Sequence, residues 1–216
     1  FTKDILYVIP TLLKVRRLGY RFDGTEENVA KLAGVFLKSN KYQEVAITIS
    51  TLGPLALDGF ELTRLKSLLR QLLEKLMTLD VDAKYISNAF IGTARVVEFD
   101  PSTVGFENFI VKLLQQASDQ PIDHSFSPQE TATIIHSFAK LLELNYELKN
   151  QKDKIISLIK KLIPLPLNKR HISMTMEAYG ILAKFSIINS DEDLDLIPII
   201  QSYLPGLYSQ LCYNSN

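Results

Sequence analysis

The chain has 216 residues, of which 46% are hydrophobic and 22% charged, and these ordinary globular proportions favour a folded chain over an intrinsically disordered one. Lysine plus arginine and aspartate plus glutamate both number 24, so the formal net charge is zero and the basic excess of a dedicated nucleic-acid clamp is missing. The single cysteine, Cys212, excludes an internal disulfide and an all-thiolate zinc site, and it favours a reducing compartment.

In chain order, the sequence predicts a series of helix pairs, each with a first helix followed by a second helix. Each segment repeats apolar residues at three- and four-residue steps, the spacing of one helix face. The clearest is 61–78, where five leucines recur in this way between basic residues. Ser127, Pro128 and Glu130 form a capping-box start signal. The first helices are expected over 3–20, 43–60, 84–99, 129–146 and 173–188, and the second helices over 25–38, 61–78, 103–117, 152–163 and 191–211.

The first helices align on one column of mostly small residues, which we call the anchor column. Successive anchors lie between 40 and 45 residues apart, the length of a helix pair. Residues four and one before the anchor are mostly apolar, so this face is expected to enter a core, with close helix approach at the small anchors. The anchors are Leu13, Gly53, Ala94, Ala139 and Ala183.

These patterns predict an all-α fold, an α-solenoid of about five two-helix repeats coiled into a right-handed superhelix. Neighbouring pairs would bury each other's remaining apolar surface, so the array would share one core and form a single domain over 1–216. The repeats are expected at about 3–40, 43–80, 82–120, 127–165 and 170–211.

Catalytic and metal-binding signatures are missing from the sequence. It contains no glycine-rich phosphate loop, no paired-histidine zinc motif and no nucleophile elbow. His124, His136 and His171 are widely spaced, with no carboxylate placed to complete a metal site, and Cys212 has no histidine nearby. We therefore expect no enzyme activity, no catalytic residue, no metal and no small-molecule cofactor. The apolar stretches are too short to span a bilayer.

The residue after each anchor is basic in four of five repeats: Lys14, Arg95, Lys140 and Lys184, with Pro54 as the exception. Equivalent positions on stacked helices form a ladder, and a ladder of cations can follow a phosphate backbone. Polar residues on the same helices are candidates for further RNA contacts: Lys84, Asn88, Gln129, Thr133 and His136. The alternative is structural, because basic residues favour the carboxyl half of a helix and their stems cover apolar neighbours.

The segment 126–141, FSPQETATIIHSFAKL, resembles a repeat of the octotricopeptide and heptatricopeptide group, which is related to the helical region of FAST-kinase-like and RAP-domain proteins. The matching residues are Phe126, Ser127, Pro128, Gln129, Glu130, Ala132, Ala139, Lys140 and Leu141. The resemblance implies organellar RNA work, in transcript processing or stability, or a place in a mitochondrial ribosome. The chain begins at Phe1 rather than methionine, so we expect it to be either a processed or a partial product.

Two functional hypotheses follow. The first is a mitochondrial helical-repeat protein that binds single-stranded or ribosomal RNA, or that is a structural part of an RNA–protein assembly such as the mitoribosome. The alternative is a protein–protein scaffold of the HEAT or armadillo kind in a large complex, in another organelle or the cytoplasm. Zero net charge and apolar candidates near the end of the chain, Tyr203, Leu207 and Tyr208, favour the scaffold. An enzyme with an unrecognised site is a weaker third class.

Overall fold

The protein is all-helical in a computed structural model that describes residues 7–8, 11, 14–15, 18–20, 24–57, 61–99, 105–120, 127–144, 148–162 and 168–188. Within these ranges there are eight α-helices, two short 3-10 helices and no strand. Their bounds are α2 (Thr25–Val35), η1 (Phe36–Lys38), α3 (Tyr42–Leu57), α4 (Leu62–Leu76), α5 (Ala83–Phe99), α6 (Glu107–Asp119), α7 (Pro128–Glu143), η2 (Lys149–Gln151), α8 (Lys152–Leu162) and α9 (Lys169–Lys184).

Two helix starts are fixed by capping boxes. Ser127 Oγ accepts a hydrogen bond from the Glu130 amide at 3.2 Å, and the Ser127 amide donates to Glu130 Oε2 at 2.7 Å, which confirms the predicted start of α7. Asn168 Oδ1 accepts from the His171 amide at 3.0 Å. This second cap begins α9 at Lys169, four residues before the predicted segment.

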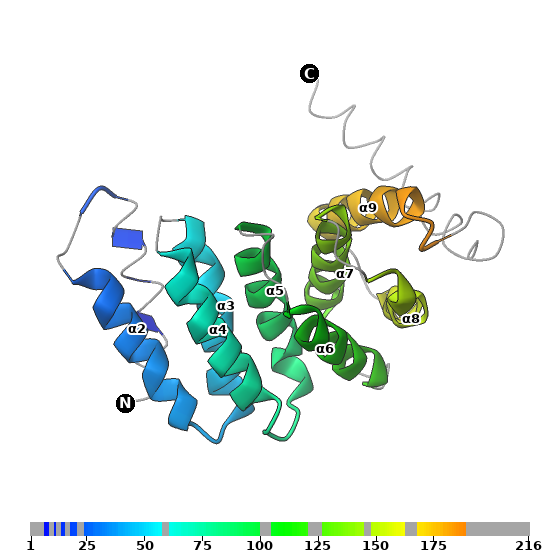
Figure 1. Ribbon diagram of the computed structural model, residues 1–216. Helices are drawn as coiled ribbons and strands as arrows, with labels where there is room; N and C mark the ends of the chain where they lie inside the picture. The colour runs from blue at the N-terminus through cyan, green and yellow to red at the C-terminus, as the bar shows by residue number, and fades with distance from the viewer. Residues whose placement is uncertain are drawn as a thin grey trace.

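The helices fall into two sets that alternate along the chain. The A helices, α3, α5, α7 and α9, pack against one another in chain order. The B helices α4, α6 and α8 each pack on the A helix that precedes them, and α2 contacts α4 (Figure 1). The helix direction changes along the row: α2 to α5 run steeply in this view, whereas α8 is seen end-on and α9 lies across the top of α7.

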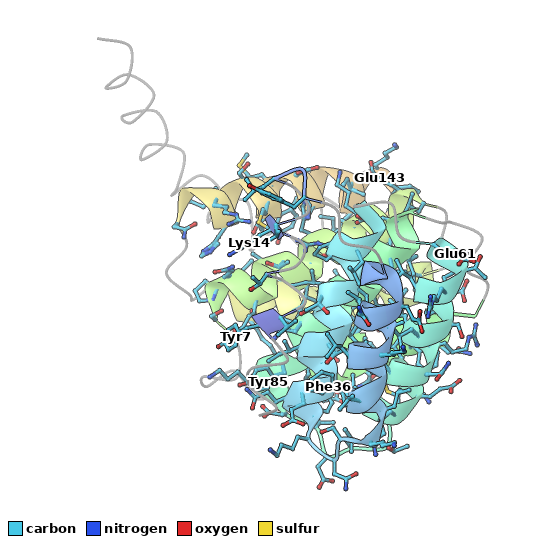
Figure 2. The ribbon with its side chains drawn as sticks, turned by 90° about the vertical axis from the view of Figure 1, so that its left-hand side faces the viewer. Tyr7, Lys14, Phe36, Glu61, Tyr85 and Glu143 are labelled. Carbon is cyan, nitrogen blue, oxygen red and sulfur yellow. The ribbon has the colours of Figure 1, made fainter. Side chains whose placement is uncertain are left out.

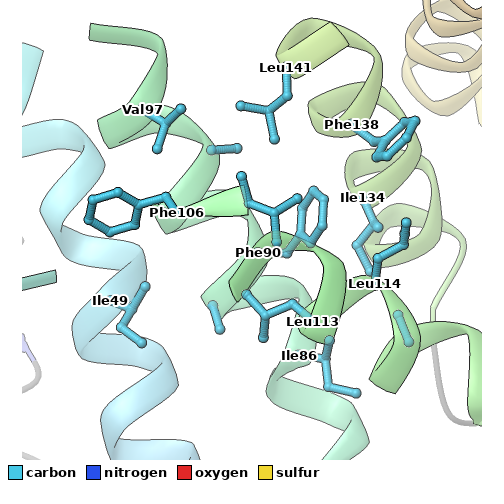
Figure 3. Packing of buried hydrophobic residues seen from close by; sticks show 14 of the residues in the cluster. Ile49, Ile86, Phe90, Val97, Phe106, Leu113, Leu114, Ile134, Phe138 and Leu141 are labelled. Atoms are coloured by element: carbon cyan, nitrogen blue, oxygen red, sulfur yellow. The ribbon is translucent and has the colours of Figure 1, made fainter. Parts of the chain in front are cut away.

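One continuous hydrophobic core runs through the described pairs. Its largest fully buried side chains include Phe36, Phe90 and Phe138. Figure 3 shows Phe90 of α5 with Leu113 and Leu114 of α6 and with Ile134 and Phe138 of α7. Most of the described apolar positions around the anchors are buried: Ile49, Leu52, Leu55, Phe90, Val96, Ile135, Phe138, Leu141 and Leu182. On α9, Tyr179 and Phe185 are half-buried and the anchor Ala183 is exposed. The sequence pattern therefore identified the buried face of α3, α5 and α7, whereas the expected burial of the anchor is wrong for Ala183.

Helices α3 and α5 approach each other closely at two glycines, Gly53 on α3 and Gly92 on α5. A Cβ atom on Gly92 would lie 2.3 Å from the Ile49 carbonyl oxygen, and one on Gly53 would lie 2.6 Å from the Arg95 Cβ. Both distances are far below van der Waals contact, so only glycine fits in this arrangement. The expectation of close approach at the small anchor is confirmed at Gly53.

Buried hydroxyl groups on the A helices bond within their own helix. Thr48 Oγ1 donates to the Glu44 carbonyl and Thr93 Oγ1 to the Ala89 carbonyl, both at 2.7 Å. Thr175 Oγ1 donates to the His171 carbonyl, also at 2.7 Å. A buried hydroxyl without a partner is costly, and the carbonyl one turn earlier removes this cost.

A few polar contacts tie neighbouring pairs together. Lys161 Nζ on α8 donates to three carbonyls at the end of α6, those of Ala117 at 3.3 Å and of Ser118 and Gln120 at 2.5 Å. These are carbonyls that a helix end leaves without intrahelical partners. Burial lowers the Lys161 pKa, although Asp119 acts in the opposite direction. No described helix is both long and apolar enough to cross a membrane.

Candidate functional site

The predicted site residues on α5 and α7 share one face of each helix. On α7, Gln129, Thr133, His136 and Lys140 are spaced by four, three and four residues, so they lie in one stripe. On α5, the corresponding stripe holds Lys84, Asn88 and Arg95, and on α9 it holds Glu177 and Lys184. We call this surface the outer A face. On these helices Lys84, Arg95, Gln129 and Lys184 are exposed, and Asn88, Thr133, His136 and Lys140 are half-buried.

Figure 2 views the molecule from the α2 end. Lys14 and Tyr85 of α5 lie on one side in this view, and Glu61, just before α4, and Glu143 of α7 lie on the other. Lys14 is exposed, and its alignment with the predicted cations of α5, α7 and α9 stays a prediction.

An ion-pair network joins α7 to α9 in the middle of the outer A face. Lys140 Nζ lies 2.7 Å from Glu177 Oε1 and 3.3 Å from Glu143 Oε2. His136 Nε2 lies 3.1 Å from Glu177 Oε2. Glu177 therefore contacts two of the residues that the sequence analysis proposed as RNA contacts, Lys140 for phosphate and His136 as a further polar contact.

The pKa shifts agree with this pairing. The hydrogen bond from Lys140 lowers the Glu177 pKa, and the bond to Glu177 raises the Lys140 pKa. On α5, burial raises the pKa of the half-buried Glu98, although Arg95, His136 and Lys140 lower it. We call Arg95, Glu98, His136, Lys140, Glu143 and Glu177 the charged cluster. It has three carboxylates and two permanent cations, so it is not a positive patch.

The remaining predicted cations have contacts of their own. Lys184 Nζ lies 5.6 Å from the centroid of the Phe185 ring, and Lys84 Nζ lies 5.8 Å from that of Tyr85. The Arg95 stem covers Gly53 of α3. The alternative that these stems cover neighbouring surface therefore applies to Arg95.

Arg95, His136 and Lys140 are thus brought to one place, and three carboxylates accompany them that the sequence analysis did not include. Glu98 and Glu143 each stand four residues after an anchor, so the alignment contained a signal for both. Glu177 required the α7–α9 packing to be known. His171 is a capping residue, and His124, Cys212, Tyr203, Leu207 and Tyr208 lie outside the described residues.

Neither a metal site nor a relative points to a chemistry for this face. Across the residues that the structure describes, no group of three histidine, cysteine or acidic side chains is placed to hold a metal ion. No family model matches the chain, and no curated protein or solved structure matches it. Its function must therefore be argued from its own surface.

Proposed function

We propose that this protein is a helical-repeat scaffold whose outer A face binds a protein partner, and that it has no catalytic activity. The observation that carries this proposal is the pairing of Lys140 and His136 with Glu177. A phosphate backbone would have to displace these carboxylates, whereas a protein partner can match a surface of mixed charge. A net charge of zero supports the same conclusion.

We further propose that the fold is a solenoid of about five repeats that forms a right-handed superhelix. Its support is the succession of A helices, each with a B helix packed on it, in three pairs: α3 with α4, α5 with α6, and α7 with α8. The first segment of the first repeat, 3–20, is described at only a few positions, and the last segment, 191–211, lies outside the described residues. Stacked repeats present the extended surfaces that such proteins use for binding.

Direct RNA binding is the second candidate. Lys84, Arg95 and Lys184 are exposed on the outer A face, and cations at this spacing along stacked helices can contact successive phosphates. Together with the resemblance of 126–141 to organellar RNA-associated repeats, they favour a mitochondrial RNA–protein assembly, such as the mitoribosome, as the setting. In that setting the scaffold and the RNA would be neighbours in one complex.

A charge-matched pair of triple variants tests both candidates. The A-face triple replaces Lys84, Arg95 and Lys184 with alanine, and the control triple replaces the exposed B-helix residues Arg64, Lys112 and Lys160. Affinity capture from native extract is done with and without nuclease. We expect the same protein partners in both conditions, retained by the control triple and lost with the A-face triple.

Fluorescence anisotropy with a labelled single-stranded RNA tests the RNA-binding candidate directly. At about 50 mM salt, where phosphate contacts are strongest, we expect no binding by the wild-type protein. Binding that weakens with salt, and whose salt slope decreases in the A-face triple but not in the control, would contradict the scaffold proposal. It would establish the RNA-binding candidate instead.

A further inference from the structure

Helix α5 carries a stripe of the outer A face in which two cations flank two uncharged residues. Lys84, Asn88, Ile91 and Arg95 are spaced by four, three and four residues, so they lie on one side of the helix. Lys84 and Arg95 are exposed, and Asn88 and Ile91 are half-buried. We call these four residues the α5 stripe. Its cations are eleven residues apart, which is about 16.5 Å along a helix that rises about 1.5 Å per residue.

The cations of the α5 stripe differ from the neighbouring cation on α7. Lys140 of α7 forms two ion pairs. Within the described part of the chain, neither Lys84 nor Arg95 forms one. Glu98 interacts electrostatically with Arg95, but it shares this interaction with His136 and Lys140. Lys84 and Arg95 can therefore each receive a carboxylate from a partner while the ion pairs of α7 stay intact.

Helix α3 places an uncharged surface beside the α5 stripe. The two helices are closest where Gly92 of α5 meets the backbone of Ile49 and Ser50 on α3. The α3 residues at positions equivalent to the stripe are half-buried, and none is charged: Gln43, Ile47, Ser50 and Pro54. A partner that lies along α5 therefore meets positive charge at two separated points, and uncharged surface between and beside them.

The spacing of the two cations favours an α-helix among protein segments. Eleven residues make just over three helical turns, so residues i and i+11 of a partner helix lie on one side, about 16.5 Å apart. Residues i+4 and i+7 lie on the same side, at the levels of Asn88 and Ile91. On one side of an extended strand, residues four or six apart are about 13 or 20 Å apart, and neither distance matches.

A nucleic-acid strand fits the α5 stripe less well than a helix does. It carries one phosphate for each nucleotide, so a strand that joined Lys84 to Arg95 would also place phosphates over Asn88 and Ile91. The Ile91 side chain has no donor for a phosphate, whereas an apolar side chain of a partner helix gains free energy by covering it. The charge spacing therefore favours carboxylates on a protein.

We propose that the partner lays an amphipathic helix along α5, with two acidic residues eleven apart that pair with Lys84 and Arg95 and apolar residues between them that cover Ile91. This inference rests on the proposed function and names the chemistry of its partner. Arg95 can hold a carboxylate through two parallel hydrogen bonds, whereas Lys84 acts as a point charge. Lys184 lies on α9, beyond α7, so the helix does not contact it.

The first test compares two designed peptides by fluorescence anisotropy at about 50 mM salt, where surface charges are weakly screened. Both are alanine-based helices of about 20 residues, long enough to be helical alone. The matched peptide has glutamates at i and i+11 and leucines at i+4 and i+7. The control peptide moves one glutamate by two residues, to the opposite side of the helix. We expect the matched peptide to bind about tenfold more tightly. Equal binding, or no binding of the matched peptide, overturns the proposal.

The second test reverses the charges on the protein. The double variant Lys84→Glu, Arg95→Glu should bind the matched peptide about tenfold or more weakly, and a peptide with lysines at i and i+11 should restore binding. Lys184→Glu is the matched control on the same face and should leave binding unchanged. Circular dichroism checks folding, and Lys84→Glu alone with a singly reversed peptide provides a milder version. An equal effect of Lys184→Glu, or no restoration, contradicts the helix assignment.

Two further outcomes separate this inference from the proposed function. If the A-face triple loses its captured protein partners while the matched peptide shows no preference, the scaffold proposal stands and the acidic helix is wrong. If single-stranded RNA binds the wild-type protein, the matched peptide does not, and the double variant weakens RNA binding, the α5 stripe binds phosphate and both proposals fail.

Discussion

His171 performs a structural task that its sequence position did not reveal. It occupies the third position of α9, where a capping box usually has glutamate or glutamine, and its Nδ1 atom accepts from the Asn168 amide at 3.4 Å. Only a neutral imidazole has this acceptor. Burial, together with the neighbouring Arg170, lowers the His171 pKa in the folded protein.

The stability of α9 should therefore depend on pH. Because the folded pKa lies below the ordinary histidine value of about 6.5, the stabilisation is complete above that pH and is lost as the pH falls through the folded pKa. We expect urea unfolding to show decreasing stability from about pH 7.5 to pH 5.5. His171→Gln should flatten this slope, because the glutamine side chain does not titrate. An unchanged slope in His171→Gln would contradict the role of the cap.

At the candidate site, the sequence analysis named the basic residues but not the carboxylates that lie beside them. The repeat register gave Arg95, Lys140 and Lys184 equivalent positions on α5, α7 and α9, and the helical period predicted which other residues share a stripe with each of them. It did not give the charge of that face. Glu177 stands six residues before its anchor and meets Lys140 only because α9 packs on α7. A charge pattern within one helix does not contain this information.

Among the elements, the α3–α5 contact has the least tolerance for added volume. A methyl group on Gly92 would collide with the backbone of α3 at Ile49 and Ser50. We expect Gly92→Ala to destabilise the protein by about 1–3 kcal/mol, the usual cost of overpacking. Gly34→Ala on α2, where a methyl group meets nothing within 4 Å, should stabilise it by about 0.5–1 kcal/mol. Chemical denaturation measures both, and equal effects would refute the close approach.

Helix positions were predictable to the extent that one apolar stripe continued along each segment. The segments 61–78 and 152–163 correspond to α4 and α8 within a few residues. The starts of α6 and α9 were wrong by four residues for local reasons. Gly105 adopts a positive φ of 100° and its amide donates to Glu107 Oε2, so α6 begins at Glu107. Asn168 caps α9. Hydrophobic periodicity predicts neither the turn at Gly105 nor the cap at Asn168.

For the whole molecule, the shared core implies that damage in one pair reaches its neighbours. Phe90 is 1% exposed, and in Figure 3 it lies among residues of both α6 and α7. Phe90→Ala should cost about 3–5 kcal/mol, as for other buried phenylalanines. Hydrogen exchange should show faster opening of α5, α6 and α7 together. Val81→Ala, at an exposed position, is the control. Faster exchange confined to α5 would argue for independent pairs.

The buried threonines have a mechanical consequence. Since Thr48, Thr93 and Thr175 bond to carbonyls of their own helices, these bonds move with each helix and specify no distance to the next one. These hydroxyl groups therefore leave the contact between successive A helices to apolar packing, which tolerates small sliding, and at α7 and α9 also to the ion pairs of Glu177. Under tension the array should therefore extend and recover reversibly before any of these hydroxyl groups loses its hydrogen bond.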